Sequence, residues 1–179
     1  MSANETIVLG GGCFWCTEAV YVNVRGITDV ESGYSNGKTG RPSYEQVCTG
    51  STGYNEVVKL VYDPEQISSR QILEIFFVVH DPTTLNRQGN DSGTQYRSGI
   101  YYTTPEQKQV ADEMVRQLTQ EDAFGKPVVT EVQPMTNYWP AEGYHQDFFE
   151  KNPGQGYCMA VAAPKVAKFR KTFTDLVKA

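Results

Sequence analysis

The stretch Ile7-Val8-Leu9-Gly10-Gly11-Gly12-Cys13-Phe14-Trp15-Cys16 decides how the chain begins to fold. Its three aliphatic residues predict a short buried strand, and the three glycines that follow indicate a turn. A helix is expected from about Phe14 to Val24, ending near Gly26. Cys13 therefore stands where a strand ends and a helix begins. Because the unpaired amides and the dipole of a helix N-terminus favour a thiolate, we expect a lowered pKa for Cys13.

Further strands and helices are interspersed along the chain, with no internal repeat and no linker that would divide it. Strands are expected at 28–34, 56–62, 100–103 and 128–132, and helices begin near 68–69, at 105 and before 166. Period-two spacing places Glu56 on the same strand face as Val58, Leu60 and Tyr62. The segments 83–95 and 138–156 are irregular, and such long loops often carry function. This pattern predicts one domain over residues 1–179, of mixed α/β or α+β class, with a tail helix in the segment from about 150 to 179.

The composition argues against nucleic acid and membranes as partners. Lys plus Arg number 16 and Asp plus Glu number 21, which gives a net charge of −5 and a pI of about 5.1. The basic residues concentrate only in the last 16 positions, with the spacing of a solvated helix face. The longest apolar run, Ile75 to Val79, is far shorter than the roughly 18 residues that span a bilayer. Because no segment resembles a secretory signal, we expect a cytoplasmic protein.

Four cysteines are present, Cys13, Cys16, Cys48 and Cys158, which are too few for a disulfide scaffold in 179 residues. In a reducing compartment, thiols serve chemistry, metal binding or core packing. The first two form half of a zinc site, but no second pair with ligand spacing exists, so we expect no metal. Their spacing also suits a thioredoxin-like redox pair, and an inert, buried Cys13 is a third possibility.

The two aromatic residues after Cys13 point to the kind of substrate. Phe14 and Trp15 place an aromatic surface beside the sulfur, which suits a methyl or thioether group. The preceding glycines let a substrate approach the backbone closely. They do not form a dinucleotide fingerprint, because Trp15 stands where the third glycine would be required.

Gly12-Cys13-Phe14-Trp15 resembles the active-site signature of the A-type peptide-methionine sulfoxide reductases, the peptide-methionine (S)-S-oxide reductases. The resemblance extends in the family's order from about residue 6 to 158. Its further segments are Ser32-Gly33-Tyr34, Pro42-Ser43-Tyr44-Glu45-Gln46-Val47-Cys48, Thr52-Gly53-Tyr54-Asn55-Glu56-Val57, His80-Asp81-Pro82-Thr83-Thr84, 87–98 and His145-Gln146-Asp147. Long ordered matches of this kind are more specific than any one short motif.

The resemblance implies a fold and a set of roles. The implied fold is an α+β two-layer sandwich of ferredoxin-like type with long irregular loops. The implied activity is reduction of methionine S-sulfoxide, free or in proteins, as a repair of oxidised proteins. The residues that match are the nucleophile Cys13, the acid Glu56, Tyr44 and Tyr96 for the sulfoxide oxygen, Asp91 of the polar loop, and Phe14 and Trp15 for the methyl group. A sulfoxide sulfur becomes electrophilic when its oxygen is protonated or hydrogen-bonded, so this set supplies what the chemistry needs.

Attack on the sulfoxide implies a sulfenic acid on Cys13, which a second thiol must resolve to a disulfide. Cys158 resembles the family's C-terminal resolving cysteine, and its glycine-rich approach would let it move toward Cys13. Cys16, at a position where many members have Gly, is the alternative. Cys48 is interpreted as a small buried residue. The resemblance implies thioredoxin as the reductant and neither metal nor organic cofactor, and we expect a monomer.

Other interpretations remain open at the level of the residues. Glu56 alone could be a solvated strand carboxylate, and His80 and His145 are more typical of structural histidines. The chain departs from the family at Tyr54-Asn55-Glu56, where His-Ala-Glu is common. A general disulfide oxidoreductase using Cys13 and Cys16, or a binding module for methionine sulfoxide or thioethers, would share the same motif.

Overall fold

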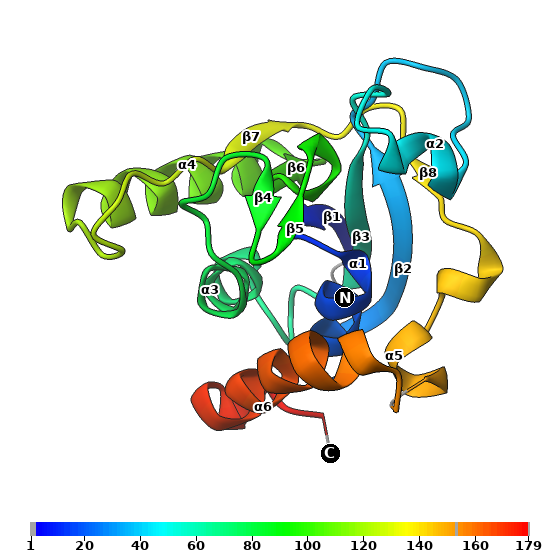
Figure 1. The fold of residues 1–179 in the computed structure, drawn as a ribbon. Coiled ribbons are helices and arrows are strands. Elements are labelled where there is room, and N and C mark those ends of the chain that lie inside the picture. The colour runs from blue at the N-terminus through cyan, green and yellow to red at the C-terminus, as the bar shows by residue number, and fades with distance from the viewer. Residues whose placement is uncertain (1–2, 153, 179) are drawn as a thin grey trace.

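A six-stranded sheet forms the centre of the computed structural model, which describes residues 3–152 and 154–178 (Figure 1). Its strand order is β7-β6-β1-β3-β2-β8, and only β6 and β7 pair in parallel. The strands are β1 (Glu5–Gly10), β2 (Ile27–Ser35), β3 (Asn55–Tyr62), β6 (Gly99–Tyr102), β7 (Glu131–Pro134) and β8 (Trp139–Pro140). A separate hairpin joins β4 (Arg87–Gln88) to β5 (Asp91–Ser92).

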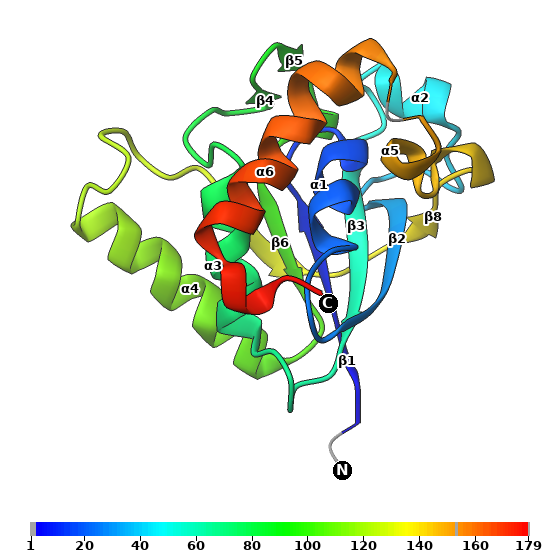
Figure 2. The same ribbon diagram turned by 90° about the horizontal axis from the view of Figure 1, so that it is seen from below.

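The helices cover one face of this sheet, as Figure 2 shows for α1, α3 and α6. They are α1 (Phe14–Tyr21), α2 (Tyr44–Cys48), α3 (Ser69–Val79), α4 (Pro105–Gln120), α5 (Phe148–Lys151) and α6 (Ala163–Thr172), with 3-10 turns η1 (Thr94–Tyr96), η2 (Gly143–His145) and η4 (Thr174–Leu176). A π-helical turn, η3 (Cys158–Ala162), leads directly into α6. With α1 after β1 and α3 after β3, the central strands β6-β1-β3-β2 have the βαββαβ order of a ferredoxin-like sandwich. The predicted α+β two-layer fold is confirmed.

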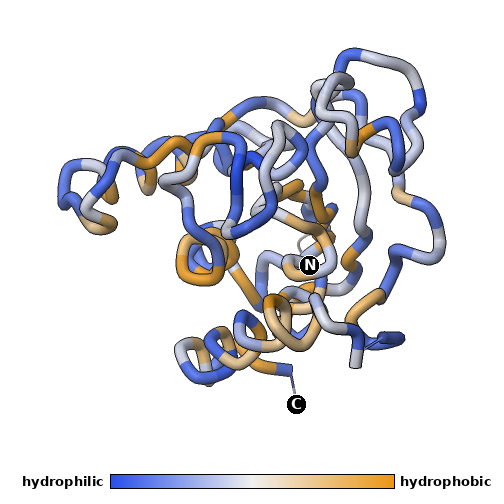
Figure 3. Tube along the Cα trace, in the orientation of Figure 1, coloured by the Kyte–Doolittle hydropathy of each residue, from blue (hydrophilic) through white to orange (hydrophobic). Residues whose placement is uncertain are grey.

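The main core lies between the sheet and the helices. Alternation along β3 sends Glu56, Val58, Leu60 and Tyr62 to this face, and each is at most 1 % exposed. The apolar stripe of α3 packs against them, and Figure 3 shows α3 as a hydrophobic segment beside the hydrophilic β4–β5 hairpin. A carboxyl group therefore lies inside an otherwise apolar row.

The local signals for helix starts were correct at α3 and α4. The Ser68 hydroxyl accepts a hydrogen bond from the Gln71 amide, and the Gln71 side chain accepts one from the Ser68 amide. Thr104 caps α4, and Pro105 occupies its first turn. The same capping pattern at Ser43 and Gln46 begins α2, which the sequence analysis missed.

Two predicted boundaries were wrong. The strand expected at 128–132 begins at Glu131, because the Val129 amide bonds to the Pro82 carbonyl and the parallel pairing with β6 starts at Gly99. Helix α1 ends at Tyr21, before the predicted Val24. Helix α6 ends at Thr172 and is followed by η4. A bridge between Val177 and Val24 then brings the chain back to the loop that joins α1 to β2.

The tail segment packs on α1. Residues from η3 through α6 lie along this helix, and Val166 and Phe169 belong to the main core. Pro153, which the sequence analysis included in the glycine-rich approach to Cys158, lies outside the described residues. No helix within 3–152 and 154–178 has the length and apolar character needed to cross a membrane.

Candidate active site

Cys13 is the N-cap of α1, at the end of the loop that leaves β1. Cys16 follows one helical turn later and is buried, and the two thiols are close enough to share a hydrogen bond. Gly12 before them has φ +96°, and a Cβ there would lie 2.6 Å from Cγ of Gln88. Only glycine fits this turn without strain, so the chain can place a thiol directly at the helix start.

The Glu56 carboxyl group lies beside that helix start. Its Oε1 accepts a hydrogen bond of 3.3 Å from the Phe14 amide, and no described residue bonds Oε2. Burial raises the pKa of Glu56 to about 8, the Phe14 amide opposes this rise, and the charges of Asp91 and Cys16 add to it. Glu56 is therefore mostly protonated at neutral pH and can donate a proton. The alternative of a solvated strand carboxylate is wrong.

The expectation of a lowered pKa for Cys13 is also wrong in this state of the protein. Burial raises its pKa well above the usual value, and the hydrogen bond with Cys16 and the Glu56 charge act in the same direction. The pKa of Cys16 is lowered, because Cys13 donates a hydrogen bond to it. The Trp15 amide acts in the opposite direction, but its hydrogen bond does not outweigh the burial and the two neighbouring groups.

Tyr44 and Tyr96 approach this pair from two other segments. Tyr44 is the first residue of α2, and its ring lies 6.4 Å from the Phe14 ring in a stacked arrangement. Tyr96 ends η1. Burial raises the pKa of both phenols, and the Glu56 charge raises each further. Both hydroxyls thus stay protonated and able to donate hydrogen bonds.

Asp91 lies on β5 and accepts a hydrogen bond of 2.5 Å from the Tyr157 hydroxyl. The same hydroxyl lies 3.7 Å from Sγ of Cys16. Tyr157 therefore connects the polar loop, α1 and the residue before Cys158. The structure thus brings Asp91 to the thiol pair through a contact that the sequence analysis did not anticipate.

An aromatic cluster surrounds the side chains of Phe14 and Trp15. The Trp15 ring stacks on Phe148 at 3.7 Å between centroids, and its indole nitrogen donates to Nδ1 of His145 at 3.0 Å. The His145 ring lies 4.4 Å from Tyr44 and 5.1 Å from Phe14. Burial lowers the pKa of His145, so its neutral ring accepts the Trp15 hydrogen bond. This cluster places aromatic rings directly after Cys13 in the chain.

Several of these residues were missed from the sequence because they come from the irregular segment 138–156 or, for Tyr157, directly follow it. Glu142 accepts hydrogen bonds from the Tyr34 hydroxyl at 2.8 Å and the Tyr44 amide at 2.9 Å, and so fixes α2. The aromatic spacing of Tyr144, Phe148 and Tyr157 gave no periodic signal. His145 was interpreted as structural, and its contacts with Trp15 agree with that role.

The other cysteines are placed differently from one another. Cys158 is buried, and burial raises its pKa, with the nearby Cys16 charge acting in the same direction. It sits in the η3 turn packed against α1 rather than in a free glycine-rich segment. Cys48 is exposed at the end of α2, so its interpretation as a small buried residue is wrong. The short helix begun by the Ser43 cap turns this side chain away from the core.

His80 lies under the Gly11 turn with both ring nitrogens in hydrogen bonds, to the Phe76 carbonyl and to the Ser98 hydroxyl at 2.7 Å. Burial lowers its pKa to about 4, as expected for a structural histidine. Within residues 3–152 and 154–178, no three His, Cys, Asp or Glu side chains are grouped so that they could hold a metal ion.

The family description "Peptide methionine sulfoxide reductase" matches residues 5–177. The chain belongs to this family. The peptide methionine sulfoxide reductase MsrA of Saccharolobus solfataricus is 55 % identical over 174 residues, which cover 97 % of each chain. That of Deinococcus radiodurans is 52 % identical over 177 residues, 99 % of this chain and 86 % of the relative. The resemblance inferred from the motifs is confirmed.

A solved structure shows the same fold. Reduced Mxr1 from Saccharomyces cerevisiae has a TM-score of 0.79 at 36 % identity, covering 87 % of this chain and 89 % of that one. Mxr1 has also been solved in complex with Trx2.

The buried carboxyl group of this reductase predicts a pH-dependent stability. Since the pKa of Glu56 rises from 4.5 to about 8, the folded protein binds more protons than the unfolded chain between these values. Glu56 therefore destabilises the fold as pH rises through this window. Between about pH 5 and pH 9, we expect Glu56→Gln to gain on the order of 4 kcal/mol in free energy of unfolding relative to the unsubstituted protein.

Urea unfolding across this pH range measures the effect, with the exposed Glu74→Gln as the control that should show no such gain. Parallel pH profiles for the Glu56 variant and the unsubstituted protein would contradict the burial argument.

Proposed function

We propose that the chain reduces the S epimer of methionine sulfoxide, free and in proteins, with Cys13 as the nucleophile. The observation that carries this proposal is the position of a largely protonated Glu56 beside a thiol at a helix N-terminus, next to an aromatic cluster. A sulfoxide combines a basic oxygen, an electrophilic sulfur and a methyl group. The acid, the thiol and the aromatic cluster each suit one of these parts.

In the proposed first step, the methyl group packs against the aromatic cluster of Phe14 and Trp15. Tyr44, Tyr96 and Glu56 direct protons at the sulfoxide oxygen, and Oε2 of Glu56 is free of protein partners for this purpose among the described residues. The Cys13 sulfur loses its proton and attacks the sulfoxide sulfur as Glu56 transfers its own proton to the oxygen. The proton released by the Cys13 thiol returns Glu56 to its protonated form. The oxygen ends on Cys13 as a sulfenic acid, and the substrate leaves as a thioether, so Cys13 is oxidised by two electrons.

Asp91 has a separate proposed role. Its carboxylate accepts the Tyr157 hydrogen bond and adds to the rise in the pKa of Glu56. It therefore helps to keep the acid protonated at neutral pH, and it holds Tyr157 over the thiol pair.

The contacts favour Cys16 as the first resolving thiol, although the sequence ranks Cys158 first. Cys13 and Cys16 share a hydrogen bond, and residues one helical turn apart have Cα separations in the range that a disulfide spans. The Cys16 thiol attacks the sulfenic sulfur, a disulfide forms, and water leaves. Cys158 would first have to leave its place in η3 to reach Cys13.

Thioredoxin is the proposed reductant of the disulfide. The complex of Mxr1 with Trx2 supports this assignment, since the yeast protein shares the fold. Exchange would return two thiols to the enzyme and leave an oxidised thioredoxin. The enzyme thiols pass two electrons to the sulfoxide, thioredoxin restores them, and Glu56 moves the proton, so we propose no cofactor. A cytoplasmic, monomeric, single-domain enzyme stays a prediction from the sequence.

We expect activity on the S epimer of a blocked methionine sulfoxide and none on the R epimer, with dithiothreitol as reductant. Cys13→Ser should abolish turnover, because a serine hydroxyl cannot accept the oxygen. Separate turnover assays on the two epimers check this. Insulin-disulfide reduction without sulfoxide reduction would favour the general disulfide oxidoreductase. Full turnover by Cys13→Ser would contradict both mechanisms, since each of them uses the Cys13 thiol.

Glu56→Gln should slow the single-turnover reductase step by about 100-fold or more, with a smaller effect on substrate binding, because proton delivery is lost. In the unsubstituted enzyme this rate should fall as pH rises through about 8, where Glu56 ionises. Rapid-mixing measurements across pH test both statements. An unchanged rate in the variant at neutral pH would remove Glu56 from the acid role.

The resolving step can be assigned with two serine variants. Cys16→Ser should accumulate the Cys13 sulfenic acid under thioredoxin recycling, since it lacks the adjacent thiol. Cys158→Ser is the matched control and should still form one disulfide per sulfoxide reduced. Trapping the sulfenic acid with a dimedone probe reads out both variants, and accumulation in Cys158→Ser alone would restore the assignment made from the sequence.

A further inference from the structure

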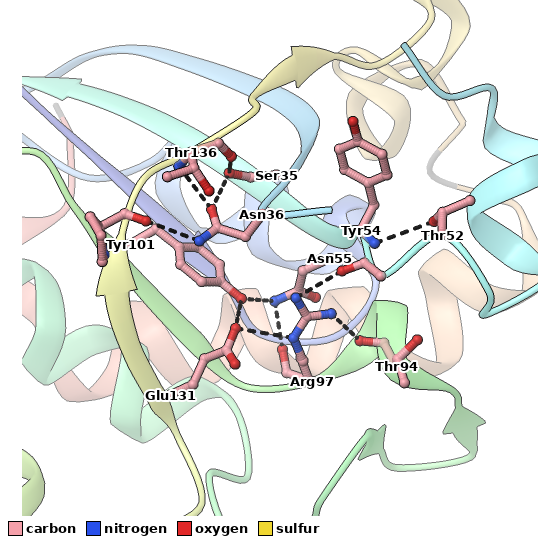
Figure 4. A network of polar contacts seen from close by, with 12 residues as sticks. Ser35, Asn36, Thr52, Tyr54, Asn55, Thr94, Arg97, Tyr101, Glu131 and Thr136 are labelled. Atoms are coloured by element: carbon pink, nitrogen blue, oxygen red, sulfur yellow. Dashed lines mark hydrogen bonds and ion pairs between the residues drawn. The ribbon is translucent and has the colours of Figure 1, made fainter. Parts of the chain in front are cut away.

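Four side chains on the sheet face opposite the helices form a polar cluster, which we call the back-face network (Figure 4); Asn55 and Tyr101 are buried, and Arg97 and Glu131 are partly exposed. Its members are Asn55, Arg97, Tyr101 and Glu131. The Tyr101 hydroxyl donates to Glu131, and Nε of Arg97 donates to the same carboxylate at 3.1 Å. Nδ2 of Asn55 donates to the Tyr101 hydroxyl at 2.9 Å and to the Arg97 carbonyl at 3.0 Å. The network thus joins β3, β6 and β7.

The Arg97 guanidinium also fixes two loop carbonyls. Nη1 donates to the Thr94 carbonyl at 2.9 Å, and Nη2 donates to the Gly53 carbonyl at 3.0 Å. These carbonyls belong to η1 and to the turn that leads into β3. A planar guanidinium with five N–H donors can bond to three acceptors in fixed directions at once. A lysine ammonium on a flexible stem does not reproduce this geometry.

Each network residue adjoins a part of the proposed catalytic machinery. Asn55 precedes Glu56 on β3, and Arg97 follows Tyr96 at the end of η1. The Asn55 side chain also lies against Gly10, where a Cβ would come within 2.3 Å of Nδ2. Gly10 begins the loop that carries Cys13. One cluster on the back of the sheet therefore contacts the supports of the nucleophile, the acid and a tyrosine on the front.

We propose that Arg97 and Asn55 are positioning residues that hold Glu56, Tyr96 and the Cys13 loop in their relative places for the reductase step. The proposal rests on the function proposed above. The alternation of side chains along a strand is what transmits the constraint, because fixing Asn55 on one face fixes Glu56 on the other. Arg97 is the C-cap of η1, so fixing its backbone also restrains the adjacent Tyr96.

The chemistry of the network favours a positioning role over stability alone. Arg97 is only 16 % exposed at its side chain, and pairing a poorly hydrated charge with Glu131 gains little net stability compared with apolar packing. Oδ1 of Asn55 is buried without a partner among the described residues, which carries a further cost. Such a cluster adds little to the free energy of unfolding but fixes the positions of its residues. This suits an active site whose reacting groups need sub-ångström placement.

The test compares Asn55→Ala and Arg97→Lys with a control on the same sheet face, Tyr138→Phe, which loses the 2.6 Å hydrogen bond to Glu31. Single-turnover rates are measured against pH together with Tm. We expect the rate at neutral pH to fall about tenfold in both network variants. Displacement of β3 or η1 lets water reach Glu56 and so lowers its pKa. The pH at which the rate falls on the alkaline limb of the profile, about 8 in the unsubstituted enzyme, should therefore be at least one unit lower in both variants.

Several other groups face Glu56 and will contribute to that limb in every variant. They are Cys13 and Cys16 from α1, Asp91 from β5, Tyr96 from η1, Tyr44 and Cys48 from α2, and Tyr34 from β2. None of them is substituted, so a shift unique to the network variants reports on the placement of Glu56.

The possible outcomes separate the two proposals. A lower Tm with an unchanged rate and pH limb in the network variants would overturn the positioning role. A fall in rate and limb in Tyr138→Phe as large as in Asn55→Ala would do so as well. Loss of the limb in the unsubstituted enzyme would instead refute the acid role of Glu56. If Arg97→Lys fails to fold, Asn55→Ala decides the question by itself, since it removes two hydrogen bonds and keeps the Arg97 pair with Glu131.

Discussion

The hydrogen bond from the Phe14 amide to the Glu56 carboxyl group is the contact on which the site depends. It joins the first residue of α1 to the central strand and places an acid within an apolar row. Because the carboxyl group is buried and has a single hydrogen-bond partner among the residues that the structure describes, it retains its proton at neutral pH. The sheet, the helix start and the acid thus form one unit, and the loops supply the remaining groups around it.

This arrangement changes how the nucleophile must be understood. A helix N-terminus alone would favour a Cys13 thiolate, but here partial burial and the neighbouring Cys16 and Glu56 raise the pKa of the thiol. The resting protein therefore has a protonated Cys13 paired with Cys16. A protonated acid removes one of the charges that oppose ionisation of Cys13. The acid and the nucleophile are thereby coupled, and neither pKa belongs to one residue alone.

The sequence predicted those features whose signals are local. The period of β3, the Ser68 and Thr104 caps and the strand-glycine-cysteine order at the start all corresponded to real elements, and the ordered motifs identified the family. The β7 boundary depended on a bond from Val129 to Pro82, and the surroundings of Trp15 depended on His145, 130 residues away. Such distant contacts leave no periodic trace. The burial that raises the pKa of Cys13, and the exposure of Cys48, likewise emerge only when the loops are packed.

The π-helical turn over Cys158–Ala162 has a consequence for how this tail can vary in length. A π turn accommodates one residue more than an α turn, so deletion of one residue here would give a regular helix. Everything before the deletion would rotate by about 100° around the axis of α6. Tyr157 would then leave Asp91, and Cys158 would leave the side of α1. An insertion or deletion of a single residue would therefore rotate this tail, and the rotation would change which thiol and which hydroxyl face the rest of the protein.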